Sequence, residues 1–168
     1  MSRLFLFRHA KAAWAEPGMR DFDRNLSPDG VEEATKIGHE LRERDLKPQK
    51  IICSSAARAK QTFDAIDQGD GWSDLVEFDP TLYSTDAPGY LEVAAAIDME
   101  GDLMLIGHNP MLEDLAIGLG QNGNDEAYTH INMGFGTACI AIIRFDGPMS
   151  GVQTAKCELE DYIRPRDL

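Results

Sequence analysis

The feature that most constrains the fold is a short apolar run near the amino terminus, which ends in two basic residues. Residues 4–7 read Leu-Phe-Leu-Phe, and Arg8, His9 and Ala10 follow directly. Such a run is too short for a buried helix and is typical of a strand buried on both faces of a sheet. A guanidinium and an imidazole therefore follow the end of a core strand, where open α/β sheets bind their ligands.

Two further apolar runs repeat this arrangement. Residues 50–54 predict a second buried strand, followed by a helix with Ser55 as N-cap and Arg58 in its first turn. The free N–H groups at such a helix start favour an anion, and Arg58 adds a full positive charge. Residues 103–106 predict a third strand, and His108 follows it.

The segment after His108 favours a helix that runs to residue 119. Asn109 is expected as its N-cap and Pro110 as its first helical residue, since both types are preferred there. His108 is then expected just ahead of a helix N-terminus, again at the carboxyl end of a core strand. Three separate strand ends thus deliver basic or ionisable side chains.

The remaining pattern predicts an α/β protein. A helix is expected from an N-cap at Ser27 and Pro28 to a stop near Pro48, with Val31 on its apolar face. Strands alternating with helices, then a hairpin, predict a three-layer αβα sandwich with a mostly parallel central sheet and a C-terminal antiparallel hairpin. At 168 residues the chain is expected to be one domain, residues 1–168. The other expected elements are an edge strand at 76–78, a helix at 87–97, strands at 137–145 and 152–160 joined by a turn at 147–151, and a loose tail at 164–168.

Two long connections separate these elements. Residues 11–26 carry Lys11, Arg20 and Arg24 as possible pocket cations and Trp14 as a possible hydrophobic wall, although a solvated loop is an equally good interpretation. Residues 118–136 are rich in glycine and include His130, to which we assign no role. Gly134 and Gly136 lack the preceding strand and third glycine of a dinucleotide-binding fingerprint.

Composition and charge limit the classes of binding partner and the cellular location that can be expected. The net charge of −13 argues against nucleic acid or an anionic membrane surface as general partners. No apolar stretch approaches the roughly 20 residues of a membrane span, and no signal-peptide pattern opens the chain, so a cytoplasmic location is expected. Cys53, Cys139 and Cys157 lie in apolar runs without metal-binding spacing and are expected to be reduced core thiols.

The basic residues at the strand ends suit one chemistry. Arg8, Arg58 and His108, with two helix N-termini, would form a site for a tetrahedral dianion. A neutral imidazole, with a pKa near 6.5, is a capable nucleophile, so His9 could attack phosphorus and form a phosphohistidine that water cleaves. Two arginines and a protonated His108 would then stabilise the charge, and neither metal nor cofactor is expected.

Four segments together resemble the histidine phosphatase superfamily, also called phosphoglycerate mutase-like. Residues 8–10 (Arg-His-Ala) resemble its Arg-His signature, and residues 23–30 resemble a segment of its short SixA-type phosphohistidine phosphatases. Residues 54–62, with Arg58, and residues 107–110 (Gly-His-Asn-Pro) match two further elements. The resemblance keeps its order and spacing from residue 4 to about residue 119, and no motif is matched after Gly120.

The resemblance implies particular roles. His9 is implied as the phosphorylated nucleophile, with Arg8, Arg58 and His108 as the phosphate pocket, and Arg24 and Asn109 are placed with the substrate-binding residues. Larger members of the superfamily also use a carboxylate as proton donor, which we cannot assign here. The acidic residues in the right general region are Glu77, Asp79 and Asp86.

The function expected on these grounds is a cofactor-independent phosphatase of SixA type, acting on a phosphohistidine protein of a phosphorelay or phosphotransfer system. A leaving imidazole needs far less acid assistance than an alkoxide, which suits a chain without an assigned acid. The alternatives are a small-molecule phosphomonoesterase and a phosphate-binding or phosphocarrier module without turnover. A mutase and a purely structural protein are disfavoured, and the oligomeric state is left open.

Overall fold

A six-stranded sheet organises the protein, whose computed structural model describes residues 1–168. The strand order is β3-β2-β4-β1-β5-β6, with parallel pairing from β3 to β1 and antiparallel pairing of β5 with both of its neighbours. This confirms the predicted mostly parallel sheet with an antiparallel pair at the C-terminal end. The strands are β1 (Ser2–Arg8), β2 (Lys50–Ser54), β3 (Val76–Asp79), β4 (Asp102–Gly107), β5 (Ile140–Phe145) and β6 (Glu158–Ile163).

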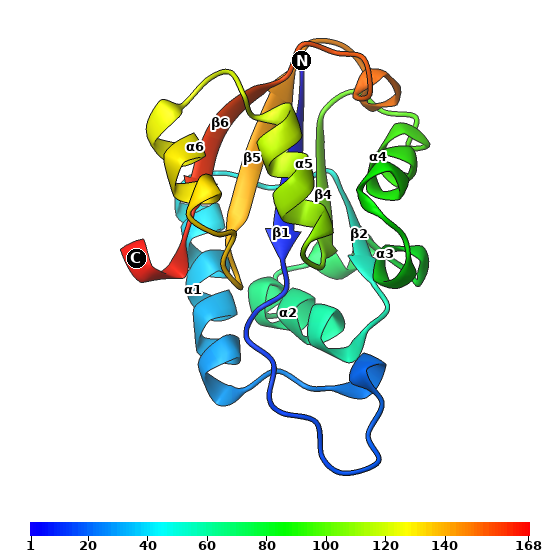
Figure 1. The fold of residues 1–168 in the computed structure, drawn as a ribbon, viewed down its shortest axis with the longest axis vertical. Helices are drawn as coiled ribbons and strands as arrows, with labels where there is room; N and C mark the ends of the chain where they lie inside the picture. The colour runs from blue at the N-terminus through cyan, green and yellow to red at the C-terminus, as the bar shows by residue number, and fades with distance from the viewer.

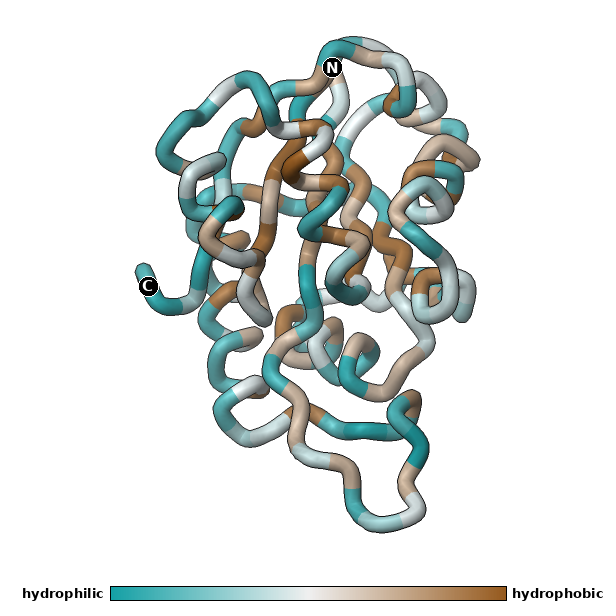
Figure 2. The backbone as a smooth tube through the Cα atoms, viewed as in Figure 1, coloured by the Kyte–Doolittle hydropathy of each residue, from teal (hydrophilic) through white to brown (hydrophobic).

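Helices cover both faces of the sheet, which is why the central strands are apolar throughout. Leu4 and Leu6 of β1 belong to one hydrophobic core with α4, α5 and α6. Phe5 and Phe7 point into the other core, with α1 and α2. These layers are visible in Figure 1, and Figure 2 shows the apolar residues gathered on the central strands. The helices are α1 (Pro28–Glu43), α2 (Ala57–Asp67), α3 (Thr81–Ser84), α4 (Ala87–Ala95), α5 (Met111–Leu119) and α6 (Asp125–Asn132).

The register of the sheet brings the three predicted strand ends together. Arg8 of β1 pairs with Gly107 of β4, and Cys53 of β2 pairs with Ile106 of β4. The carboxyl ends of three adjacent parallel strands therefore meet at one edge of the sheet. The long connection from β1 to α1 projects beyond this edge, at the bottom of the view in Figure 1.

The start of α1 agrees with the prediction, but its end does not. Ser27 is the N-cap, and its Oγ accepts a hydrogen bond from the Gly30 N–H at 3.1 Å. The helix stops at Glu43 rather than near Pro48, because Asp45 takes a left-handed conformation (φ 55°) that the helix cannot continue. Val31, placed on the apolar face, is 46% exposed.

Two predicted helix caps were wrong. The N-cap of α2 is Ala56, not Ser55, and the Ala56 N–H donates to the side chain of the preceding strand-end residue, Ser54, at 3.3 Å. At α5 the N-cap is Pro110 rather than Asn109. In both places the turn after the strand is longer than expected, so the helix begins one residue later.

The second half of the chain differs most from the expectation. The connection at 118–136 contains α6, which the Asn124 side chain caps by accepting from Ala127 N–H. The two last strands pair as predicted, but β6 begins at Glu158, after a connection that includes a short 3₁₀ helix at Met149–Gly151. The tail is not loose, since Pro165–Asp167 forms another 3₁₀ turn. The short helix α3 was not predicted.

All three cysteines are buried and free, as predicted. None of the helices is long and apolar enough to span a bilayer.

Candidate active site

His9 and His108 lie side by side at the carboxyl ends of β1 and β4. They follow the paired residues Arg8 and Gly107, and the His9 N–H donates to the Gly107 carbonyl at 3.0 Å. Their ring centroids are 5.1 Å apart, with an interplanar angle of 54°. Only 8% of His9 and 5% of His108 is exposed. The sheet register therefore converts two positions about a hundred residues apart into one pair of imidazoles.

The contacts of His9 define which ring nitrogen is free. Its Nδ1 lies 2.7 Å from the Ala10 carbonyl oxygen, which can only accept, so Nδ1 carries the proton. Nε2 accepts a hydrogen bond from Arg58 Nε at 3.3 Å. Burial, reinforced by His108, Arg58 and Arg8, lowers the pKa of His9 to about 3. His9 is therefore a neutral imidazole with the Nε2 lone pair directed toward a cation.

Arg58 lies in the first turn of α2, and its guanidinium is held from two sides. Besides the bond from Nε to His9, Nη1 donates to the backbone carbonyl of Asp21 at 2.8 Å. Nη2 donates to the carboxylate of the same residue at 3.0 Å, and the Arg58 side chain is only 9% exposed. The charge predicted at this helix start is thus fixed beside His9.

Arg8 supplies a second cation to the cluster. Its Nη1 donates to the Phe135 carbonyl at 2.8 Å, and burial lowers its pKa. Arg8 Nε and His108 Nδ1 are buried and have no hydrogen-bond partner in the protein. A buried polar group left without a partner costs about 1–3 kcal/mol, so the oxygens of a bound anion would stabilise the Arg8 Nε–H, and would stabilise His108 Nδ1 when that nitrogen carries a proton.

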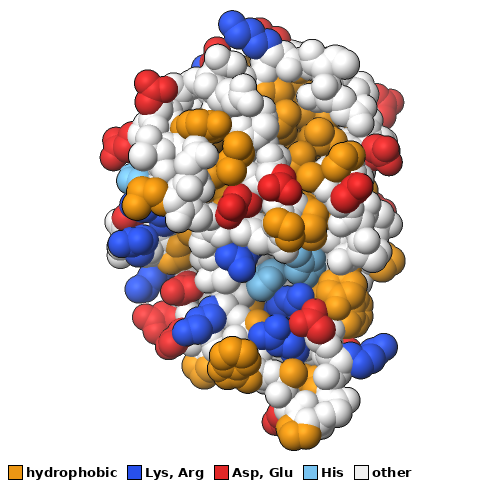
Figure 3. All heavy atoms as spheres, viewed as in Figure 1, with side chains coloured by type: hydrophobic (Ala, Val, Ile, Leu, Met, Phe, Trp, Pro, Cys, Tyr) orange, Lys and Arg blue, Asp and Glu red, His pale blue; other side chains and the backbone are white.

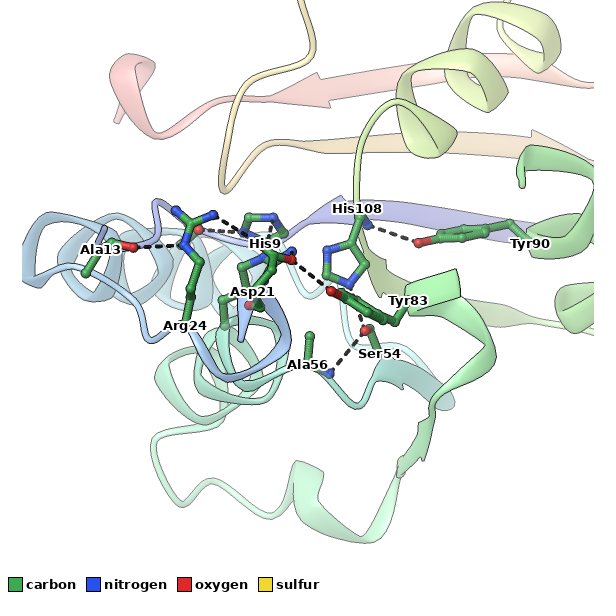
Figure 4. Close-up of polar contacts among 11 residues, drawn as sticks. His9, Ala13, Asp21, Arg24, Ser54, Ala56, Tyr83, Tyr90 and His108 are labelled. Atoms are coloured by element: carbon green, nitrogen blue, oxygen red, sulfur yellow. Dashed lines mark hydrogen bonds and ion pairs between the residues drawn. The ribbon is translucent and has the colours of Figure 1, made fainter. Parts of the chain in front are cut away.

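His108 is oriented by residues on two other elements. Its Nε2 lies 2.7 Å from Ser54 Oγ at the end of β2, and its backbone N–H donates to the Tyr90 hydroxyl at 3.1 Å (Figure 4). Burial and the nearby Arg58 lower the pKa of His108 to about 4. His108 is therefore neutral in the free protein, because desolvation and the neighbouring guanidinium both oppose a second positive charge, and a protonated His108 stays a prediction for the phosphate-bound state.

Asn109 and Arg24 form contacts within the protein. The Asn109 amide donates to the Phe135 carbonyl at 3.0 Å, the same oxygen that Arg8 contacts, so it fixes the loop beside Arg8. Arg24 donates from Nε to the Ala13 carbonyl and from Nη1 to the Asp21 carboxylate, each at 3.1 Å. A direct contact of either residue with substrate stays a prediction.

Three polar residues of this cluster were not predicted from the sequence: Ser54, Asp21 and Tyr83. Asp21 Oδ2 accepts from both Arg58 and the Tyr83 hydroxyl, the latter at 2.9 Å. The Tyr83 ring meets the His108 ring edge-on, with centroids 5.5 Å apart. Ser54 could have been noticed as the polar end of a buried strand, whereas no local signal joins Asp21 to Tyr83.

Other candidates lie outside the cluster. Trp14 is 92% exposed and forms no wall above the histidines. Lys11 is exposed and lines a separate surface cavity, and His130 lines another near the C-terminus. The three carboxylates in the expected acid region are used elsewhere: Glu77 pairs with Lys50, Asp79 accepts from Thr81 N–H and Asp86 caps α4.

The cluster lies in an open hollow of the surface. Figure 3 shows histidine atoms in this hollow, with basic side chains gathered beside them and an acidic group among these. The five cavities of the molecule lie elsewhere, and none is lined by His9 or His108. The site therefore exposes its floor to solvent while burying most of each functional side chain.

Known proteins resemble this chain over nearly its whole length. An uncharacterized protein of Mycobacterium tuberculosis is 34% identical over 165 residues, covering 95% of this chain and 99% of the relative. A solved protein described as the phosphohistidine phosphatase SixA of Agrobacterium tumefaciens is 32% identical and superposes with a TM-score of 0.82, covering 98% of each chain. A second protein so described, from Nakamurella multipartita, is 28% identical with a TM-score of 0.83, covering 98% of this chain and 96% of its own.

The family is shown by a sequence model as well as by structure. The model of the histidine phosphatase superfamily, branch 1, matches residues 4–87. That range includes most of β1, together with His9 and Arg58, while His108 lies beyond it and joins the cluster through the sheet register. The family-model match and the fold both agree with the resemblance that the strand-end motifs indicated. The chain belongs to the histidine phosphatase superfamily and has the fold of its SixA-type members.

Proposed function

We propose that this phosphatase works without a cofactor and through a phosphohistidine formed on His9. The observation that carries the proposal is the state of His9: its proton is held on Nδ1 by the Ala10 carbonyl, which leaves Nε2 unprotonated, with a lone pair for attack. Arg58 Nε lies 3.3 Å from that nitrogen. A nucleophile and a fixed cation thus meet at the point where a phosphoryl group would be transferred.

The reaction proceeds in two displacements. His9 Nε2 attacks phosphorus, the bond from phosphorus to the leaving group breaks, and the leaving group takes up a proton from solvent. A water molecule then attacks the phosphohistidine, the bond from phosphorus to Nε2 breaks, and inorganic phosphate leaves with His9 restored. Arg8 and Arg58 offset the charge on the non-bridging oxygens in both steps, the main contribution that phosphoryl transfer needs from the protein.

His108 is proposed to change its protonation when phosphate binds. In the free protein its pKa is lowered to about 4 by burial and by Arg58. A bound dianion would raise this pKa, because an opposite charge nearby favours the imidazolium. Its unpartnered Nδ1 would then be a charged donor to a phosphate oxygen.

A phosphohistidine on a protein is the substrate we favour. The open hollow admits a phosphoryl group that projects from a large partner, and two solved relatives, 32% and 28% identical to this chain, are described as phosphohistidine phosphatases. Imidazole leaves with a pKa near 6.5 and so needs little acid assistance. This suits a site in which Glu77, Asp79 and Asp86 all have other partners. Such a donor belongs to phosphorelay or phosphotransfer systems.

The decisive experiment supplies two classes of substrate to the metal-free protein. Phosphorylated histidine-containing domains and a panel of small phosphate esters are compared by release of inorganic phosphate. We expect faster turnover of the phosphohistidine domains, whereas preference for the esters would instead indicate a small-molecule phosphomonoesterase. His9→Ala is expected to abolish both hydrolysis and labelling, and the exposed His39→Ala to change neither. Full activity of His9→Ala would end the proposal.

A phosphocarrier with the same pocket would behave differently. It would accumulate a stable phosphohistidine on His9 in stoichiometric amount, without continuing release of phosphate. Quenching the reaction at successive times and measuring protein-bound and free phosphate separates the two functions.

A further inference from the structure

The loop carboxylate of Asp21 has an unusual place in this basic cluster. Asp21 begins the short 3₁₀ helix Asp21–Asp23, in the long connection between β1 and α1. Its backbone carbonyl and its carboxylate both accept from Arg58, through Nη1 and Nη2. One residue therefore holds the outer end of the guanidinium by two hydrogen bonds, at 2.8 and 3.0 Å.

Because Asp21 accepts from Nη1 and Nη2, the edge of the Arg58 guanidinium that faces His9 is left for the reacting group. A guanidinium has five N–H donors in a fixed plane, so fixing two nitrogens fixes the direction of the third. With Nη1 and Nη2 bound to Asp21, Nε is directed at His9 Nε2, 3.3 Å away. The hydrogen on Nε is donated to His9 Nε2, and the second hydrogen on Nη2 is left on the same side of the guanidinium, beside the nucleophile.

The carboxylate is itself held from two directions. The Tyr83 hydroxyl donates to Oδ2 at 2.9 Å and Arg24 Nη1 donates to Oδ1 at 3.1 Å (Figure 4). Phe22 packs edge-on against the Tyr83 ring, with centroids 4.9 Å apart. Desolvation would raise the pKa of Asp21, but the hydrogen bonds from Tyr83, Arg24 and Arg58 and the charge of Arg58 lower it to about 2, so the group is charged at neutral pH.

We propose that Asp21 is a positioning residue, which aims Arg58 at the phosphoryl group on His9 while Tyr83 and Arg24 hold its carboxylate in place. The proposal deepens the phosphatase function and rests on it. Asp21 acts through Arg58 and does not itself touch the reacting atoms. Its role is to convert a long, flexible side chain into a rigid donor before substrate arrives, which avoids the cost of orienting Arg58 during the reaction.

The charge of Asp21 gives this role a distinctive kinetic signature. A carboxylate near the pocket repels an incoming dianion, so its removal should leave ground-state binding unchanged or tighter. Misalignment of Arg58, in contrast, weakens the contact with the transition state, where small displacements can reduce the rate by about 100-fold. We therefore expect Asp21→Ala to lower kcat by about tenfold to a hundredfold, with KM unchanged or reduced.

The experiment compares Asp21→Ala with a control from the same turn. Asp23→Ala removes the other carboxylate of the 3₁₀ helix, which pairs with the exposed Arg20, and is expected to leave kcat and KM near those of the wild type. Tyr83→Phe removes one hydrogen bond to Asp21 but keeps the ring beside His108, so a smaller fall in kcat of about threefold is expected. Thermal unfolding of each variant shows that the protein is folded.

Coupling to Arg58 distinguishes positioning from a merely structural role. Asp21→Ala is also introduced into an Arg58→Ala background, where we expect no further fall in kcat because the residue it acts through is gone. An equal fall in both backgrounds, or kcat of Asp21→Ala equal to that of Asp23→Ala, would overturn the inference. Affinity for orthovanadate, which can adopt the five-coordinate geometry of the transition state, is measured by calorimetry and gives a readout without turnover. We expect weaker binding to Asp21→Ala than to Asp23→Ala, and equal affinities would count against the inference.

These outcomes are separate from those that test the proposed function. If the wild type releases phosphate and His9→Ala does not, the function stands whatever Asp21→Ala does. If the wild type has no turnover, the phosphatase proposal fails, and the vanadate comparison alone decides whether Asp21 prepares Arg58 for an oxyanion.

Discussion

Lowering the pH should destabilise the folded protein through its two buried histidines, His9 and His108. Imidazole has a pKa of about 6.5 in an unfolded chain. In the structure, burial lowers the pKa to about 3 for His9 and to about 4 for His108. As the pH falls below the unfolded value, the unfolded state binds protons that the folded state does not. The histidines' contribution to the free energy of unfolding is therefore complete above the unfolded pKa. It is lost progressively as the pH falls from that pKa toward the pKa values of the folded state.

The magnitude follows from the two pairs of pKa values. At pH 5, linkage gives a loss of about 2 kcal/mol for each histidine relative to pH 8. The pair together would lose about 4 kcal/mol, a large share of the roughly 5–15 kcal/mol by which domains are stable. Both side chains are more than nine-tenths buried, so solvent screening reduces the effect little.

The assay is urea unfolding at a series of pH values between 8 and 5, for the wild type and His9→Asn. Asparagine keeps a donor for the Ala10 carbonyl but cannot take up a proton. We expect the wild type to lose about 2 kcal/mol more than His9→Asn over this range, equivalent to about 4–8 °C in Tm for a chain of this size. His39→Asn, an exposed substitution, should follow the wild type. If the free energy of unfolding fell by the same amount between pH 8 and pH 5 in the wild type and in His9→Asn, a buried neutral imidazole at this position would be refuted.

Two further pairs of substitutions test the surroundings of the site and its scaffold. Ser54→Ala removes the partner of His108 Nε2 and should lower kcat about tenfold with a stability loss of about 1–3 kcal/mol, while the neighbouring Ser55→Ala should change little in steady-state kinetics and urea unfolding. Gly30→Ala would place a Cβ 2.2 Å from the Lys11 carbonyl oxygen and should destabilise by about 1–3 kcal/mol. Gly118→Ala, where the space is open, should instead stabilise α5 by about 0.5–1 kcal/mol; equal effects in urea unfolding would contradict this argument.

Local sequence patterns determined the elements that carry the site. An apolar run buried on both faces can only be a central strand, so β1, β2 and β4 were predicted within a residue or two. Ser27 and Pro28 were correctly placed at the start of α1, since capping depends on neighbouring residues alone. The strand-end motifs also drew attention to Arg8, His9, Arg58 and His108, which the parallel register then brings to one edge.

Only the tertiary structure decided what surrounds those residues. Asp21 meets Tyr83 and Arg58 because a loop and two helices converge on the same strand ends, and no pattern along the chain reveals such a meeting. The protonation of His108 depends in the same way on burial and on a charge from another helix. Periodicity is a property of neighbours in the sequence, whereas electrostatics and hydrogen bonding belong to neighbours in space. That difference explains why the sequence indicated the basic residues of the site and the fold alone supplied their state and their support.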